Sequence, residues 1–266
     1  MTRRIPIERF AAGLSISASD ELSVEEPLQV LINAKPFATL MRTPGDDIAL
    51  VEGFLFSEGI VASIADIVAI ETTQHPTSQE VHVSLAGHCQ LTQASARSLY
   101  LSSSCGVCGR ASVDQLLDRI DTIPPLAVSP GFLISLLPAF GAAQKEFPQT
   151  GGVHAAALFS SNGTLRLIHE DVGRHNALDK LIGESFRAGT LPLHQSILMM
   201  SSRASFDIVQ KAATAGIPVV AAMGAASSLA ASLAQAAGIH LHCFVREKSL
   251  VSFPLLRRTV PDPDHA

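Results

Sequence analysis

A regular alternation of apolar strands and helices between residues 197 and 245 constrains the fold more than any other feature of the sequence. Strands are predicted over Ile197 to Ser201, Ile217 to Met223 and His240 to Val245. Helices are predicted between them, over Phe206 to Ala215 and Ser227 to Ala237. Because the connections are short, a parallel sheet covered by helices is the natural packing.

The residues before these units predict a hairpin and two helices. An Asn162-Gly163 turn separates apolar strands over Thr150 to Ser160 and Thr164 to His169. One helix is expected from Ser129 to Phe140, shortened by Pro138, and another from Asn176 to Arg187. These elements extend the α/β region toward the middle of the chain.

The N-terminal third predicts a β-rich region with one helix. A strand near Ile5 to Phe10 precedes a hairpin of Pro27 to Ile32 and Pro36 to Met41. Thr43 has the character of an N-cap and Pro44 suits the first helical position, while Gly59 ends this helix. The last two strands are expected over Asp66 to Thr72 and Val81 to Leu85. We therefore expect a β-rich domain over residues 1–100, an α/β domain over 101–258, and a disordered tail over 259–266.

Composition excludes several classes of protein. The 266 residues carry 19 basic and 24 acidic side chains, a net charge of −5, so no nucleic-acid partner is expected. Four cysteines are too few for a disulfide scaffold and fit a reducing compartment. The sequence contains no run of about 18 apolar residues, which a membrane-spanning helix would need. Glu8 and Arg9 interrupt the apolar region that a signal sequence would need after the first arginines. The expected location is the cytoplasm.

The stretch SSSCGVCGR, Ser102 to Arg110, predicts a reactive thiol. Cys105 and Cys108 lie between a predicted strand and a predicted helix that begins at Ser112. Unpaired N–H groups at a helix start, together with Arg110, stabilise a thiolate. The flanking glycines give the loop conformational freedom. The pattern indicates an accessible sulfur nucleophile.

A CxxC pair also occurs in two other kinds of site. A structural zinc site needs four ligands, and no second CxxC or HxxxH lies nearby in the sequence. A dithiol–disulfide oxidoreductase is the stronger rival, because a strand, CxxC and helix also form the thioredoxin-like motif. The sequence pattern alone leaves that alternative open.

HEDVGRHNALDK, His169 to Lys180, predicts an anion site. Arg174, His175, Asn176 and Lys180 gather at the first turns of a helix, where positive side chains and free N–H groups bind anions. The alternative is a solvated helix face held by Asp179 and Lys180.

Two loops further along the chain are weaker candidates for anion binding. Arg203 gives the SSRASF loop, Ser201 to Phe206, some support, whereas Met223 to Ala230 has only small residues at a strand-to-helix turn. A zinc deaminase is improbable, because Ala156 stands where the HxE motif needs its glutamate.

Several of these strings together resemble the formate dehydrogenase accessory sulfurtransferases, the FdhD family. They include LVEGFLFSEGI, SSSCGVCGR, TGGVHAAAL, EDVGRHNALDKLIG, SRAS, KAATAGIPVVA and FVR, in that order. The resemblance runs from about Glu25 to Pro254. It implies a cytidine deaminase-like α/β/α sheet domain preceded by a smaller β-rich domain, and a homodimer.

The resemblance also implies a function. In the family, a cysteine desulfurase loads sulfur as a persulfide, which passes to molybdenum or tungsten in bis-molybdopterin guanine dinucleotide before insertion into formate dehydrogenase. The cofactor is bound as a substrate, and no permanent metal is implied. A non-catalytic chaperone of this cofactor is a further alternative.

The family pattern assigns the site residue by residue. Cys105 carries the persulfide, and Cys108 assists or receives it. The implied cofactor contacts are Arg174, His175, Asn176, Asp179, Lys180, Ser201, Arg203, Ser205, Cys243, Phe244, Val245, Arg246, Glu247 and Lys248. The chain departs from the family pattern at Ser202, where glycine is common, and at His169, where arginine is common. Serine adopts a positive φ poorly, so the first departure matters if that turn requires one.

Overall fold

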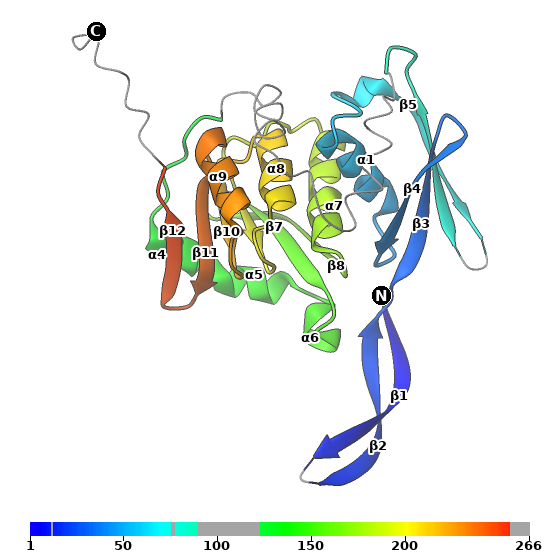
Figure 1. Cartoon of the computed structure of the whole chain (residues 1–266), viewed down its shortest axis with the longest axis vertical. Helices are drawn as coiled ribbons and strands as arrows, with labels where there is room; N and C mark the ends of the chain where they lie inside the picture. The colour runs from blue at the N-terminus through cyan, green and yellow to red at the C-terminus, as the bar shows by residue number, and fades with distance from the viewer. Residues whose placement is uncertain (12, 76–77, 90–122, 256–266) are drawn as a thin grey trace.

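A computed structural model describes all residues except 12, 76–77, 90–122 and 256–266 (Figure 1). Within the described residues the chain forms three separate sheets, of two, six and four strands. Several predictions lie outside the described residues. They are the CxxC loop with its flanking strand and helix, the domain boundary at 100/101, and the C-terminal tail.

The six-stranded sheet has the order β12-β11-β10-β9-β7-β8. Strands β9, β10 and β11 are parallel, and the hairpins β7–β8 and β11–β12 add antiparallel strands at the two sides. The strands are β7 (His154–Ser160), β8 (Leu165–Asp171), β9 (Ser196–Met200), β10 (Val219–Ala222), β11 (His240–Arg246) and β12 (Ser249–Phe253).

Helices cover both faces of this sheet. The covering helices are α4 (Pro130–Ser135), α5 (Leu137–Ala143), α7 (Arg174–Arg187), α8 (Phe206–Thr214) and α9 (Ser228–Ala237). Successive side chains of a strand point to opposite faces. Accordingly, Leu198 and Met200 join the core under α7, α8 and α9, while Ile197 and Met199 join a second core with Leu133 of α4. The predicted α/β/α sandwich is confirmed.

The four-stranded sheet, of order β4-β3-β6-β5, forms the smaller β-rich part. Its elements are β3 (Glu26–Ile32), β4 (Lys35–Arg42), α1 (Asp47–Ser57), η1 (Ile64–Asp66), β5 (Ile67–Gln74) and β6 (Gln79–Leu85). Leu28, Val30 and Val81 pack against Leu50 and Leu55 of α1 in one core. The predicted β-rich region with a single buried helix is confirmed for the described residues.

The first 23 residues form a hairpin of β1 (Thr2–Ala11) and β2 (Leu14–Ser23), which projects from the rest of the molecule (Figure 1). Only one of these strands was expected. The alternation of Leu14, Ile16 and Ala18 with serines along β2 is the signal that could have predicted this strand.

Helices α1 and α7 join the two larger parts of the protein, and charged side chains are buried beside their contact. Lys180 Nζ lies 2.8 Å from Asp171 Oδ2 and donates to the carbonyl of Thr43 at 2.9 Å. Asp179 Oδ1 lies 2.9 Å from Lys211 Nζ of α8. Burial opposes the charge of Lys211, but the Asp179 and Glu58 carboxylates outweigh it and raise its pKa.

Three local predictions are wrong. Helix α1 begins at Asp47 rather than beside Thr43, because Asp46 has a left-handed φ of 56° and the Arg42 guanidinium binds the Asp47 carboxylate at 2.7 and 3.1 Å. Pro138 lies in the first turn of a second helix, α5, instead of shortening one helix. Residues Phe147–Thr150 form the short helix α6, so β7 begins only at His154.

Candidate functional site

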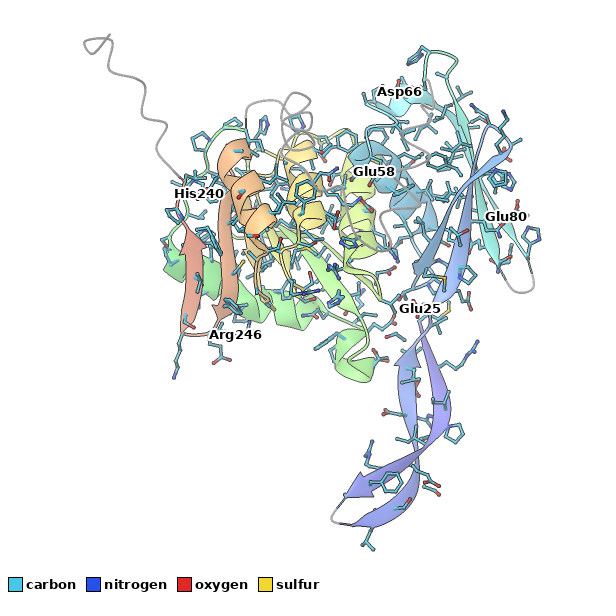
Figure 2. The ribbon with its side chains drawn as sticks, viewed as in Figure 1. Glu25, Glu58, Asp66, Glu80, His240 and Arg246 are labelled. Carbon is cyan, nitrogen blue, oxygen red and sulfur yellow. The ribbon has the colours of Figure 1, made fainter. Side chains whose placement is uncertain are left out.

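One end of the six-stranded sheet gathers most of the predicted binding residues. Strands β8, β9, β10 and β11 all run in the same direction, so their carboxyl ends meet at one edge. We call this the carboxyl edge. Figure 2 shows Arg246 at this end of β11, with His240 at the opposite end.

Backbone contacts hold the loops of the carboxyl edge together. The Ser201 hydroxyl accepts from the Ala155 N–H at 2.8 Å, which ties the end of β9 to β7. The N–H of Gly224 donates to the Ser202 carbonyl, and the N–H of Phe244 donates to the Gly224 carbonyl, at 3.0 and 3.1 Å. A Cβ on Gly224 would lie 2.8 Å from the Arg203 Cα, so only glycine allows this approach. These contacts join the loops after β9 and β10 to the end of β11 in one layer.

The carboxyl edge is positively charged. Arg174 opens α7, and Arg203 is an exposed residue of the loop after β9. Arg246 ends β11, where its Nη1 donates to the Met223 carbonyl at 2.6 Å. Partial burial lowers the pKa of Arg174, and the positive charge of Arg203 lowers it further. Clustered guanidinium groups at the N-terminus of a helix suit phosphate groups.

Three buried polar atoms at this edge have no hydrogen-bond partner among the described residues. They are Arg174 Nε, His175 Nε2 and Ser205 Oγ. His175 Nε2 lies 3.5 Å from Asp207 Oδ2, which lowers the pKa of the carboxyl group, but no well-aligned hydrogen bond joins them. Unpaired buried polar atoms are costly in a folded protein, so these three are candidates for contact with a ligand.

His154, at the start of β7, is a neighbour of this group that the sequence-based site omitted. Partial burial lowers its pKa, and the positive charges of Arg174 and His175 lower it further. The imidazole is therefore neutral near pH 7 and can accept a hydrogen bond. The sequence offered a signal only in the incomplete deaminase motif around Ala156.

The last residues of β11 and the turn after it contribute exposed side chains from an irregular segment. The pairing of β11 with β12 shifts between Cys243 and Arg246, and Phe244 in this bulge has a φ of 50°. Phe244 is 48% exposed, so it adds an apolar surface to the carboxyl edge. Glu247 and Lys248 follow at the exposed turn.

Other predicted contacts lie away from the surface of the edge. Asp179 and Lys180 are buried in the ion pairs described above, so the alternative of a solvated helix face is wrong. Asn176 donates to Asp171 Oδ1 and to the Met41 carbonyl, at 2.9 and 2.7 Å, and so connects α7 to β4. The side chains of Cys243 and Val245 are in the two cores of the sheet. Asn176 is half-buried and the other four residues are buried, and all five have structural contacts that support the edge.

The two departures from the family pattern have defined surroundings. Ser202 is buried, is not among the residues with positive φ, and donates its hydroxyl to the Arg203 carbonyl at 3.1 Å, so serine is unstrained at this turn. His169 lies between two carboxylates, with Nδ1 3.3 Å from Asp46 and Nε2 2.8 Å from Glu184. It links the start of α1 to α7 through these two carboxylates.

A cavity of about 850 Å³ lies on a different surface, between α1, β5 and the end of α7. Its lining includes the carboxylates of Glu26, Asp46, Asp47 and Glu184 and the guanidinium of Arg187. This acidic lining would repel a phosphate-bearing ligand. The carboxyl edge is therefore the better candidate for the functional site.

Neither cysteine in the described part of the chain is a good nucleophile. Burial raises the pKa of Cys243 to about 11. Burial, together with the Asp66 carboxylate, also raises the pKa of Cys89. Cys89, Asp66 and His88 have ligand atoms within 4.8 Å of one another, but the Asp66 carboxylate already accepts from Ala62, Ser63 and His88 as the cap of η1.

Together the fold and the site define an α/β protein with a binding surface at the carboxyl edge of its sheet. This surface carries arginines and buried polar atoms that have no hydrogen-bond partner among the described residues. The model of the FdhD/NarQ family matches residues 23–258, and the chain belongs to this family. Proteins named "Sulfur carrier protein FdhD" are similar over nearly their whole length. The relative in Streptomyces avermitilis is 44% identical over 94% of this chain and 93% of its own length. The relative in Mycobacterium tuberculosis is 41% identical over 92% and 93%, and that in Sulfolobus acidocaldarius is 40% identical over 93% and 94%.

A solved structure supports the fold. The crystal structure described as that of a formate dehydrogenase accessory protein from Desulfotalea psychrophila superimposes with a TM-score of 0.76. It is 23% identical in sequence and covers 95% of this chain and 96% of that chain. The two-part α/β architecture is thus shared with an experimental structure. No helix among the described residues is both long and apolar enough to cross a membrane.

Proposed function

We propose that this protein is a sulfur carrier that takes sulfur from a cysteine desulfurase and delivers it to bis-molybdopterin guanine dinucleotide before the cofactor enters formate dehydrogenase. Family membership and the names of the relatives support sulfur carriage. The observation that carries the cofactor assignment is the set of three buried polar atoms at the carboxyl edge that have no hydrogen-bond partner in the described part of the chain.

The carboxyl edge fits a ligand that bears phosphates and purines. Arg174, Arg203 and the start of α7 offer N–H donors and positive charge to diphosphate oxygens. The exposed Phe244 ring offers a face on which a guanine base can stack. Asp179 and Lys180 act indirectly, by holding α7 in place.

Sulfur transfer is assigned to Cys105, with Cys108 assisting. The Cys105 thiolate attacks the terminal sulfur of the desulfurase persulfide, the S–S bond to the donor breaks, and the donor cysteine leaves as a thiolate. Cys105 then holds the persulfide, and no external oxidant is consumed. The raised pKa values of Cys89 and Cys243 support this assignment, because they make both described cysteines poor acceptors.

A maturation assay in cells tests the proposal and separates its rivals. In a strain lacking the endogenous protein, the Cys105→Ala variant is expected to leave formate dehydrogenase inactive, whereas Cys243→Ala is expected to keep it active. Full maturation by a Cys105→Ala/Cys108→Ala double variant would contradict the proposal and select a non-catalytic chaperone. Turnover of a model disulfide that is lost in either single variant would select a dithiol oxidoreductase.

A further inference from the structure

Two histidines and a glutamate lie together where the β5–β6 hairpin turns. Glu80 and His82 belong to β6, and His75 directly follows the end of β5. The Nε2 atoms of His82 and His75 lie 2.9 and 3.4 Å from the same carboxylate oxygen, Glu80 Oε2. We call these three residues the His–Glu–His cluster. The cluster belongs to the four-stranded sheet and shares no residue with the carboxyl edge, so the inference does not depend on sulfur transfer.

The alternation of β6 places the cluster on an open face of the sheet. Residues i and i+2 of a strand share a face. Val81 and Val83 point into the core beside α1, so Glu80 and His82 point to the opposite face. Figure 2 shows Glu80 on the side of the sheet away from α1. Glu71 of β5 is paired directly with His82, which adds a second carboxylate to the same face.

Hydrogen bonding alone leaves the cluster incomplete. His82 Nε2 and the Glu80 carboxylate are joined by a hydrogen bond of 2.9 Å. His75 Nε2 approaches the same oxygen, but it is a buried atom without a hydrogen-bond partner among the described residues. Unpaired buried polar atoms are rare, because they lose the hydrogen bonds that water would give them. A cation held by both nitrogens and the carboxylate would give each of them a partner.

We propose that the His–Glu–His cluster binds a divalent transition-metal ion, with Zn²⁺ as the best fit. Zn²⁺ is held by imidazole nitrogens and carboxylate oxygens at about 2.0–2.2 Å, so neighbouring ligand atoms of a tetrahedral site lie roughly 3.4 Å apart. The two nitrogen–oxygen distances in the cluster are close to this spacing. Two imidazoles and one carboxylate form the ligand set of zinc sites that keep an open position. Water or the Glu71 carboxylate can take that position.

One side chain has to move before a single ion can contact all three ligands. The group around Asp66 is the only one in the described part of the chain whose three ligand atoms all lie within 4.8 Å of one another. His75 must therefore turn toward His82, and its side chain is 43% exposed, so the core does not prevent this rotation. The Asp66 group is nevertheless the weaker candidate, because its carboxylate caps η1 and burial raises the pKa of the Cys89 thiol.

Isothermal titration calorimetry with ZnCl₂ tests the site. The full chain carries Cys105→Ser/Cys108→Ser as a background, so that these thiols do not take the ion, and it is expected to bind one Zn²⁺ at the cluster. Adding His82→Gln removes a ligand and should weaken binding at least tenfold. His88→Gln is the matched control, because His88 is an exposed histidine of the Asp66 group, and it should leave the affinity unchanged. Absence of Zn²⁺ binding, equal affinity of the His82→Gln variant and its background, or weakening only by His88→Gln would overturn the proposal.

Electron paramagnetic resonance of the same background protein with one equivalent of Cu²⁺ identifies the ligands. Cu²⁺ is a suitable probe, because sites of this kind generally bind it more tightly than Zn²⁺. Hyperfine coupling to two imidazole nitrogens is expected, and His75→Gln and His82→Gln should each reduce it to one. Coupling to two nitrogens that persists in either single variant would contradict the assignment of the ligands.

Discussion

Gly53 of α1 and Gly183 of α7 lie directly against each other. A Cβ built on either glycine would come within 2.7 Å of the backbone nitrogen of the other. The two helices therefore cross with their backbones in contact, a distance that no side chain other than hydrogen permits. This crossing joins the β-rich part to the α/β part and fixes the position of α7, whose first turn carries Arg174 and His175.

Replacing Gly183 by alanine tests the importance of this crossing. The new methyl group would meet the Ala49 carbonyl and the Gly53 backbone, neither of which can move without shifting a helix. We expect a loss of about 3 kcal/mol in the free energy of unfolding, measured by denaturant titration. Gly141→Ala in α5 is the matched control, because a Cβ there meets nothing within 4 Å and alanine is the better helix former. An equal effect of both changes would contradict the account of the crossing.

The buried pair of Lys211 and Asp179 gives a second prediction. Lys211→Met leaves the Asp179 carboxylate buried with a hydroxyl partner, Ser57, but no cation, and should cost roughly 3–5 kcal/mol of stability. The double variant Lys211→Met/Asp179→Asn removes both charges and should recover much of that loss. The exposed Lys35→Met should change stability by less than about 0.5 kcal/mol. Chemical denaturation of the four proteins measures the differences, and a double variant no more stable than Lys211→Met would contradict the pairing.

His242 predicts an acid-sensitive stability. Burial and the neighbouring His240 lower its pKa to about 4, while its Nδ1 lies 2.8 Å from Ser252 Oγ. Because the folded pKa lies below the unfolded value of about 6.5, the unfolded chain binds more protons between these values, so stability falls as the pH drops from about 6.5 to about 4. His242→Gln should flatten this part of the curve of unfolding free energy against pH. An unchanged slope would show that other groups cause the acid sensitivity.

The carboxyl edge predicts nucleotide binding that depends on charge. GDP carries the guanine and diphosphate of the proposed cofactor, and Arg203→Ala should weaken its binding about tenfold or more, because a charge-assisted hydrogen bond is lost. Arg166→Ala is the matched control, since Arg166 is equally an exposed arginine but lies near the opposite end of β8. Isothermal titration calorimetry measures both affinities. Equal weakening by the two variants would show that only net charge matters.

Sequence patterning predicted the α/β part well because its strands and helices have distinct apolar periods. Residues 197–245 gave nearly correct boundaries for β9, α8, β10, α9 and β11. Tertiary contacts overrode local signals elsewhere. Thr43 resembles an N-cap, yet its N–H and hydroxyl bind Asp171 and Val172, far away in the sequence, at 3.1 Å each.

The positions of site residues could be predicted from the sequence where these residues follow a strand. They could not be predicted for residues on the buried side of α7. Arg203 and Ser205 come directly after an apolar strand, so their position at the carboxyl edge follows from the fold class. Asp179 and Lys180 looked like surface residues, because charged side chains on a helix normally face solvent. The sequence did not reveal that α1 and α8 bury this side of α7.

The most direct test of sulfur carriage is the mass of the Cys105 peptide after incubation of the protein with a cysteine desulfurase and free cysteine. The proposal predicts one additional sulfur atom on that peptide, removed by a reductant, absent in Cys105→Ala and retained in Cys243→Ala. Sulfur that loads fully onto Cys105→Ala, or that appears on no peptide of the wild-type chain, would contradict the account.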